Sequence, residues 1–101
     1  MSQPRIAIPQ EEIEAFCRKW RVREFSLFGS VLRDDFRDDS DVDVLVEFDA
    51  AAPWSLWDWP YMIDELKAVF GREVDLVEKD ALRNEQRRRA ILSEHRVLYA
   101  A

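Results

Sequence analysis

The segment from Asp41 to Phe48 alternates between apolar and mostly polar side chains, and this alternation constrains the fold more than any other feature. Successive side chains of a β-strand point to opposite faces of its sheet, so the pattern predicts a strand with one buried face. The predicted buried face carries Val42, Val44, Val46 and Phe48, and the opposite face carries Asp41, Asp43, Leu45 and Glu47. A fold built around this strand must therefore cover one side of a sheet and accommodate acids on the other.

Helical periodicity marks three other segments. Apolar residues three and four positions apart predict a helix over about residues 9–20, with Ile13, Phe16, Cys17 and Trp20 on its buried face. A second helix is predicted from about Asp58 to Phe70, since Pro60 is tolerated only near a helix start and Gly71 suits the residue after its end. A third, charged helix is predicted over about residues 84–94.

Short apolar runs predict further strands over residues 23–28 and 73–77, and an edge strand over 97–99. The resulting order of elements predicts an α+β fold, a two-layer α/β arrangement in one domain covering residues 1–101. Its small mixed sheet would carry helices on one face and leave the other face partly open.

Charge and composition limit the functions to be considered. The net charge is −6, which disfavours direct binding of nucleic acid through bulk electrostatics. Eight acids and one base lie between Asp34 and Asp49, so a cationic ligand is expected there. Cys17 is the only cysteine, no run of apolar residues is long enough to span a membrane, and the first residues lack the apolar core of a signal peptide. We therefore expect a cytoplasmic protein without a membrane partner.

Asp41 and Asp43 lie two positions apart on the predicted strand and project from the same face. Two carboxylates about 4 Å apart repel each other by about 4 kcal/mol at an effective dielectric constant near 20. Either one of them is protonated, or a cation neutralises both. Oxygen ligands favour Mg²⁺, and Asp75 on another strand can complete a three-carboxylate site that holds two metal ions for phosphoryl transfer. A calcium-binding EF-hand is excluded, because Val44 and Ala50 occupy the positions that need glycine and glutamate.

Gly29 and Ser30 follow the predicted strand over 23–28, and ten residues separate them from Asp41. Glycine lets a backbone approach phosphate closely, and Ser30 is a predicted N-cap of a helical turn whose N–H groups could bind an anion. The sequence contains no GxxxxGK[ST] motif, so a P-loop is excluded.

The block FGSVLRDDFRDDSDVDVLVEFD, residues 28–49, resembles the GSx10DxD motif of the DNA polymerase β-like nucleotidyltransferases. The rest of the chain resembles the minimal nucleotidyltransferases (MNT proteins) of this superfamily, through the segment ELKAVFGREVDLVE, the charged helix after it and the final VLY. The resemblance extends over about residues 10–99. It implies a palm-like fold, Asp41, Asp43 and Asp75 as catalytic metal ligands, and Gly29 and Ser30 as contacts to the triphosphate of ATP. Arg33 stands where many relatives carry arginine and could contact phosphate, although a surface salt bridge to Asp34 or Asp38 would explain it too.

The resemblance also implies a partner. MNT proteins are commonly encoded beside HEPN-domain proteins as toxin–antitoxin pairs, in which the MNT member adenylylates a tyrosine of the HEPN ribonuclease. The short chain is expected to leave no room for an acceptor-binding domain, so another protein would present the acceptor. The predicted function is therefore an Mg²⁺-dependent transferase of AMP that acts as an antitoxin. The alternative is an MNT-like antitoxin that neutralises its partner by binding, with a vestigial site.

Two groups of residues are left without a firm role. The connection 50–60 does not match the family motif, and its Trp54, Trp57 and Trp59 fit a helix-anchoring core or a partner interface better than stacking on adenine. The basic residues near the C-terminus suit a solvated helix face, with docking to a partner or binding of phosphate as the alternative; they are Arg83, Arg87, Arg88, Arg89 and Arg96.

Overall fold

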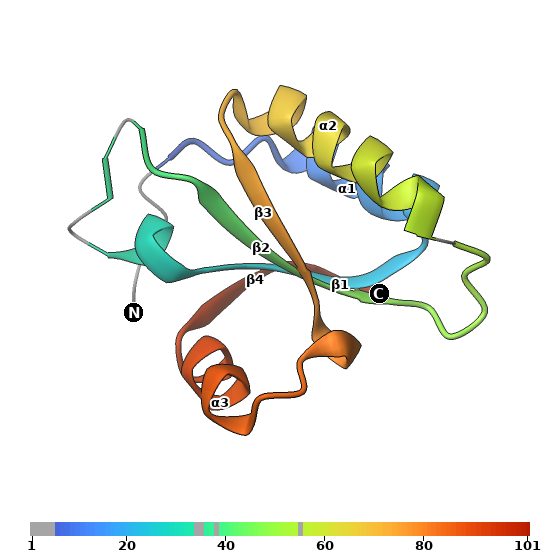
Figure 1. The fold of residues 1–101 in the computed structure, drawn as a ribbon. Coiled ribbons are helices and arrows are strands. Elements are labelled where there is room, and N and C mark those ends of the chain that lie inside the picture. The colour runs from blue at the N-terminus through green and yellow to red at the C-terminus, as the bar shows by residue number, and fades with distance from the viewer. Residues whose placement is uncertain (1–5, 34–35, 38, 55) are drawn as a thin grey trace.

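A computed structural model describes residues 6–33, 36–37, 39–54 and 56–101 (Figure 1). Over these residues the chain forms three α-helices, four β-strands and three short 3₁₀ turns. In chain order these are α1 (Gln10–Trp20), β1 (Val22–Phe28), η1 (Gly29–Leu32), β2 (Val42–Phe48), η2 (Leu56–Asp58), α2 (Trp59–Phe70), β3 (Val74–Glu78), η3 (Lys79–Ala81), α3 (Glu85–Ser93) and β4 (His95–Ala100).

The described strands form one mixed sheet in the order β3-β2-β1-β4. β1 pairs antiparallel with both β2 and β4, whereas β2 and β3 are parallel and are connected through α2. The predicted α+β fold with a small mixed sheet is thus confirmed. The short edge strand expected at residues 97–99 is also present, and it extends over the whole of β4.

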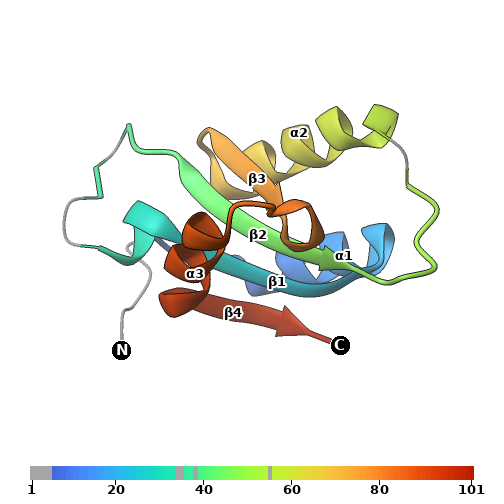
Figure 2. The same ribbon diagram turned by 60° about the horizontal axis from the view of Figure 1, so that its bottom comes forward.

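Two layers of helix lie on opposite sides of the sheet (Figures 1 and 2). Helices α1 and α2 cover one face, where the predicted valine face of β2 joins the main apolar core. The prediction placed the helices on one face only, but α3 packs on the other face, where Ile91 contacts a smaller apolar cluster with Phe28 and Leu45. Leu45 explains the difference, because an apolar residue between Asp43 and Glu47 gives this face of β2 its own small core.

The predicted buried face of α1 and the predicted cap after α2 are confirmed. Ile13, Phe16, Cys17 and Trp20 of α1 are all buried. Burial raises the pKa of the Cys17 thiol to about 12, so this cysteine is an unreactive part of the core. α2 has its proline in the first turn and ends at Gly71, whose φ of +69° and N–H bond to the Lys67 carbonyl form the predicted C-terminal cap. Among the described residues, no helix combines the length and the apolar character required to cross a bilayer.

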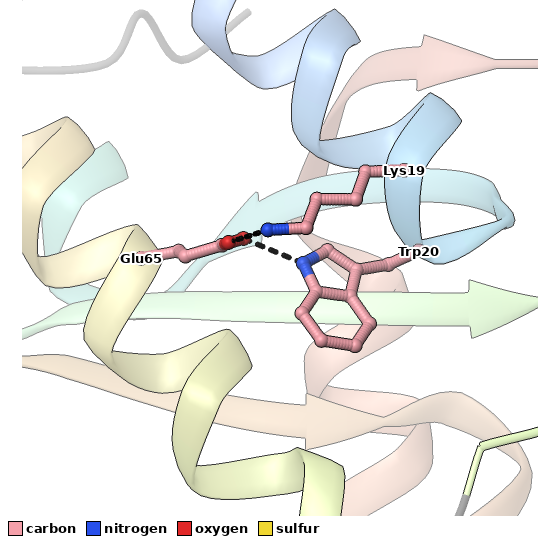
Figure 3. Close-up of polar contacts among 3 residues, drawn as sticks. All are labelled: Lys19, Trp20 and Glu65. Atoms are coloured by element: carbon pink, nitrogen blue, oxygen red, sulfur yellow. Dashed lines mark hydrogen bonds and ion pairs between the residues drawn. The ribbon is translucent and has the colours of Figure 1, made fainter.

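A shared carboxylate connects α1 to α2 (Figure 3). Glu65 on α2 accepts a hydrogen bond from the indole N–H of Trp20, with 2.5 Å between Nε1 and Oε2, and it forms an ion pair with Lys19. Burial alone would raise the pKa of Glu65, but the hydrogen bonds from Lys19 and Trp20 outweigh it and hold this pKa below its usual range. The contact fixes the two helices that cover the same face of the sheet.

Replacing Glu65 by alanine is expected to lower the free energy of unfolding by about 1–2 kcal/mol, because the buried Trp20 indole N–H loses its charged acceptor. Glu73→Ala is the matched control, since the side chain of Glu73 is 67% exposed and that of its partner Lys67 is 42% exposed, and ion pairs at the surface contribute little. Urea unfolding followed by circular dichroism measures both variants. Equal small losses would show that the Trp20–Glu65 contact contributes nothing specific.

The three tryptophans of the 50–60 connection separate into two kinds. Trp54 packs edge-on against Trp20 and donates a hydrogen bond to the Trp20 carbonyl, and Trp59 packs against Phe48. Both are partly buried against the main core, as expected for residues that anchor a helix. Trp57 differs, because 85% of its side chain is exposed.

Candidate functional site

A tight turn at Gly29 connects β1 to the 3₁₀ turn η1. Gly29 has a φ of +76°, a left-handed conformation that glycine adopts without steric cost. The predicted N-cap role of Ser30 is wrong, because Ser30 lies inside η1, and Phe28 occupies the cap position without a side-chain cap. The reason is local: the positive φ of Gly29 starts the turn directly after β1, two residues earlier than a cap at Ser30 requires.

The strand register brings the candidate residues of three distant segments together. Asp43 on β2 is the Cα partner of Phe28, the residue before Gly29, and also of Asp75 on β3. Neighbouring strands lie about 4.8 Å apart, and paired residues of parallel strands project from the same face. Asp43 and Asp75 therefore stand side by side on the face that α3 partly covers, and Asp41 directly precedes β2.

Asp43 is the electrostatic centre of this site. The pKa of its carboxyl group is raised to about 6, first by burial and then by the neighbouring Asp75 and Asp41 carboxylates, while Arg33 and Arg87 act in the opposite direction. The sequence left open whether one of the aspartates is protonated or a cation neutralises both. The raised pKa means that, without a cation, Asp43 binds its proton more tightly than an ordinary aspartate. A divalent cation would remove this unfavourable repulsion.

A cavity of about 300 Å³ lies next to Asp43. Its lining includes Gly29 and Ser30 from η1, Arg33 after η1, Arg87 from α3, and Glu94 after α3 as a second acid. A Cβ atom at position 29 would lie 3.1 Å from Cγ of Asp43 and would overlap its carboxylate oxygen Oδ2. The backbone at Gly29 thus approaches the Asp43 carboxylate more closely than a residue with a Cβ atom could. The guanidinium groups of Arg33 and Arg87 line the same cavity, and their positive charge suits an anionic ligand.

Arg87 is a site residue that the sequence did not single out. The sequence favoured a solvated helix face for it, with partner docking or phosphate binding as the alternative, whereas the structure shows that Arg87 lines the small cavity and lowers the pKa of Asp43. Asn84 sets the beginning of α3 by accepting a hydrogen bond from the Arg87 N–H, which fixes where this side chain leaves the helix. Only the packing of α3 against the sheet distinguishes Arg87 from its neighbours Arg88 and Arg89.

A second, larger cavity of about 920 Å³ extends from Asp75 along the end of β3. Arg87 lines this cavity as well as the small one, so the two cavities meet at its side chain. The larger cavity is bounded by the connection after β2, the start of α2, and the η3 turn.

The predicted metal ligands are the carboxylates around Asp43. Among the residues that the structure describes, no group of three histidine, cysteine, aspartate or glutamate side chains is arranged so that it could hold a metal ion. The donors near Asp43 are all carboxylate oxygens, the type that Mg²⁺ prefers, and Mg²⁺ usually takes only one or two of them together with phosphate oxygens. The donor set therefore fits an ion that arrives with a phosphate ligand. Asp34 and Asp38, the alternative salt-bridge partners of Arg33, lie outside the described residues, whereas Asp39 is exposed.

The metal-free protein is expected to lose stability relative to Asp43→Asn as the pH rises from about 4 to about 6. The folded-state pKa of Asp43 is above its ordinary value, so folding favours the protonated form, and ionisation across this window costs stability. The difference should approach about 1 kcal/mol, since water screens a half-buried group. Thermal unfolding of both proteins in a chelating buffer between pH 4 and pH 7 measures it. A pH-independent difference would contradict the electrostatic account.

Comparison with known proteins places this geometry in a family. A family model described as a nucleotidyltransferase domain matches residues 10–99. Protein adenylyltransferase MntA of Thermococcus cleftensis is 39% identical over 66 residues, which cover 65% of this chain and 65% of that protein. The match thus spans slightly less than two thirds of the curated relative.

Solved structures share the fold over most of the chain. A toxin–antitoxin structure with AMP-PNP aligns with a TM-score of 0.74 and 18% identity, over 92% of this chain and 74% of that chain. A tri-AMPylated Shewanella oneidensis HEPN toxin in complex with MNT antitoxin aligns with a TM-score of 0.66 and 18% identity, over 91% and 70%. At such identities the likeness concerns the fold. The family model covers nearly the whole chain, and the protein therefore belongs to the nucleotidyltransferase domain family.

Proposed function

We propose that this chain is an Mg²⁺-dependent transferase of AMP that uses ATP and modifies a hydroxyl group of a partner protein. The partner would be a HEPN ribonuclease toxin, its acceptor a tyrosine, and the chain its antitoxin. The observation that carries the proposal is the strand register. It places Asp43 on β2 beside Asp75 on β3 and beside the Gly29 turn that follows β1. The relative named as a protein adenylyltransferase, and the toxin–antitoxin structures of similar fold, support the choice of reaction and partner.

Each group in the site has a part in this reaction. The small cavity would hold the β- and γ-phosphates, with the backbone at Gly29 and Ser30 and the guanidinium groups of Arg33 and Arg87 facing their oxygens. Asp41, Asp43 and Asp75 are the residues that would hold magnesium, two ions in the expected arrangement. Bound magnesium would neutralise the carboxylates and stabilise the negative charge on the transferred phosphoryl group.

The bond changes follow from in-line displacement. The acceptor hydroxyl oxygen forms a bond to the α-phosphorus, while the bond between that phosphorus and the oxygen bridging to the β-phosphate breaks. Pyrophosphate leaves, and the hydroxyl proton passes to the exposed Asp75 carboxylate. Such chemistry requires ATP in the compartment, and a cytoplasmic location also suits the single, buried Cys17.

The direct test incubates the protein with ATP labelled at the α-phosphate, Mg²⁺ and the product of the neighbouring gene. We expect label on the partner, release of pyrophosphate, and no transfer by the Asp41→Asn/Asp43→Asn double variant. A double variant that still neutralises the partner in cells would favour the alternative, an antitoxin that acts by binding alone. No label on any partner with the wild-type protein would count against the transferase.

Arg87→Gln is expected to weaken binding of the ATP analogue AMP-PNP about tenfold, because a charge-assisted contact to phosphate contributes roughly 1.5–3 kcal/mol before solvent screening. Arg89→Gln is the matched control, since Arg89 is an exposed residue of the same helix that lines neither cavity. Isothermal titration calorimetry in Mg²⁺ measures both. Equal affinities for the two variants would remove Arg87 from the phosphate site.

A further inference from the structure

The larger cavity lies on the side of the reaction centre from which an acceptor must approach. Sheet order is β3-β2-β1, so Asp43 stands between Asp75 on one side and the Gly29 turn after β1 on the other. In-line displacement requires the attacking and leaving oxygens to lie on opposite sides of the α-phosphorus. With the leaving pyrophosphate held at Gly29, the attacking oxygen enters from the Asp75 side, which opens into the larger cavity.

The lining of this cavity has a definite chemistry. The described residues that line it include four acids and one arginine; they are Asp49, Asp75, Glu78 and Asp80, and Arg87. Trp54, Trp59 and Phe48 supply an aromatic wall. A ligand that complements this lining carries a positive charge next to an aromatic or apolar group. A polyphosphate is negatively charged and therefore does not complement it.

The same segment of chain also presents an exposed aromatic surface. Trp57 is 85% exposed and Tyr61 is 66% exposed, and both lie in the 49–61 stretch that contributes one wall of the cavity. Tryptophan and tyrosine are enriched where proteins bind each other, because they bury a large area at a low cost in conformational entropy. This surface favours a protein over a free small molecule as the occupant of the adjoining cavity.

We infer that the larger cavity receives a basic segment of the acceptor protein, which presents its tyrosine to Asp75, while Trp57 and Tyr61 contact the same protein outside the cavity. The inference rests on the proposed function and deepens it by defining the acceptor: a tyrosine flanked by lysine or arginine. It also assigns a role to the 50–60 connection, which follows no part of the family motif.

The first experiment measures binding without any chemistry. Fluorescently labelled random copolymers of lysine and tyrosine, and of glutamate and tyrosine, are titrated with the protein, and anisotropy reports the dissociation constants. We expect the basic copolymer to bind at least about tenfold more tightly. Asp80→Lys should weaken this binding about tenfold. Asp64→Lys, an exposed residue of α2 with the same change in net charge, should change it less than about twofold.

A steric pair of variants tests the cavity without changing charge. Ala81→Trp introduces a large side chain on the lining at η3, and Ala68→Trp places the same side chain on the exposed surface of α2. Ala81→Trp should weaken binding of the basic copolymer, and Ala68→Trp should not. The double variant Trp57→Ser/Tyr61→Ser, at exposed positions, should raise the KM for a full-length acceptor protein while leaving kcat and AMP-PNP affinity unchanged.

The outcomes separate this inference from the proposed function. Equal effects of Asp80→Lys and Asp64→Lys, or no effect of Ala81→Trp, would overturn the assignment of the cavity. Weaker AMP-PNP binding by Ala81→Trp with unchanged copolymer binding would assign the cavity to the nucleoside and overturn the inference as well. Failure of the wild-type protein to transfer AMP would instead refute the proposed reaction, since the binding measurement needs no turnover.

Discussion

Asp43→Asn is expected to reduce the rate of AMP transfer on the order of 10³-fold while the protein stays folded. The substitution keeps the size of the side chain but removes the negative charge that a magnesium ion would neutralise, and contacts to a catalytic metal are worth several kcal/mol in the transition state. Single-turnover transfer of labelled AMP to the partner, at saturating Mg²⁺ and ATP, measures the effect.

Stability provides the second half of this experiment. Asp43 is half-buried, and burial together with the neighbouring carboxylates raises its pKa, so the neutral asparagine should be at least as stable as the wild type at pH 7 without metal. Activity and stability therefore change in opposite directions. Loss of both would indicate that Asp43 serves the fold, whereas retention of activity would remove it from the site. Glu47→Gln is the control, because Glu47 lies further along the same strand and lines neither cavity.

Gly29→Ala is expected to reduce transfer at least about 100-fold, since its methyl group would overlap the Asp43 carboxylate and displace it. The left-handed backbone at position 29 adds a loss of stability of about 1–2 kcal/mol for any residue with a Cβ atom. The collision involves the end of a side chain that can rotate, so we expect a folded protein with a displaced carboxylate.

The chain offers a matched control for this variant. Gly71 has a φ of +69°, nearly the same as Gly29, but a Cβ atom there would meet nothing within 4 Å. Gly71→Ala should therefore show a similar loss of stability in chemical unfolding and retain full transfer activity. If Gly71→Ala lost activity as Gly29→Ala does, the effect at Gly29 would come from general destabilisation and not from the approach to Asp43.

Patterns within one segment predicted much of this structure. The alternation along β2 identified the strand and its buried face, and the spacing of apolar residues identified the buried face of α1. These predictions succeed because the repeat of a strand or helix is a property of neighbouring residues. The prediction of Ser30 as an N-cap also came from neighbouring residues, and it was wrong because the φ of Gly29 decides where the turn begins.

The sequence by itself identified the candidate residues for the chemistry: the Gly29–Ser30 pair, Asp41 and Asp43 at the start of β2, and Asp75 were all predicted from motif and strand pattern. Only the tertiary structure decided what surrounds them. Strand order placed Asp43 between Asp75 and the glycine turn, and the packing of α3 on the second face brought Arg87 to the site and left its neighbours outside. It also formed the acidic, aromatic cavity beside Asp75 from segments up to about 40 residues apart. Contacts of this kind depend on how elements pack against each other, and packing is decided by the whole set of apolar surfaces rather than by any one stretch of chain.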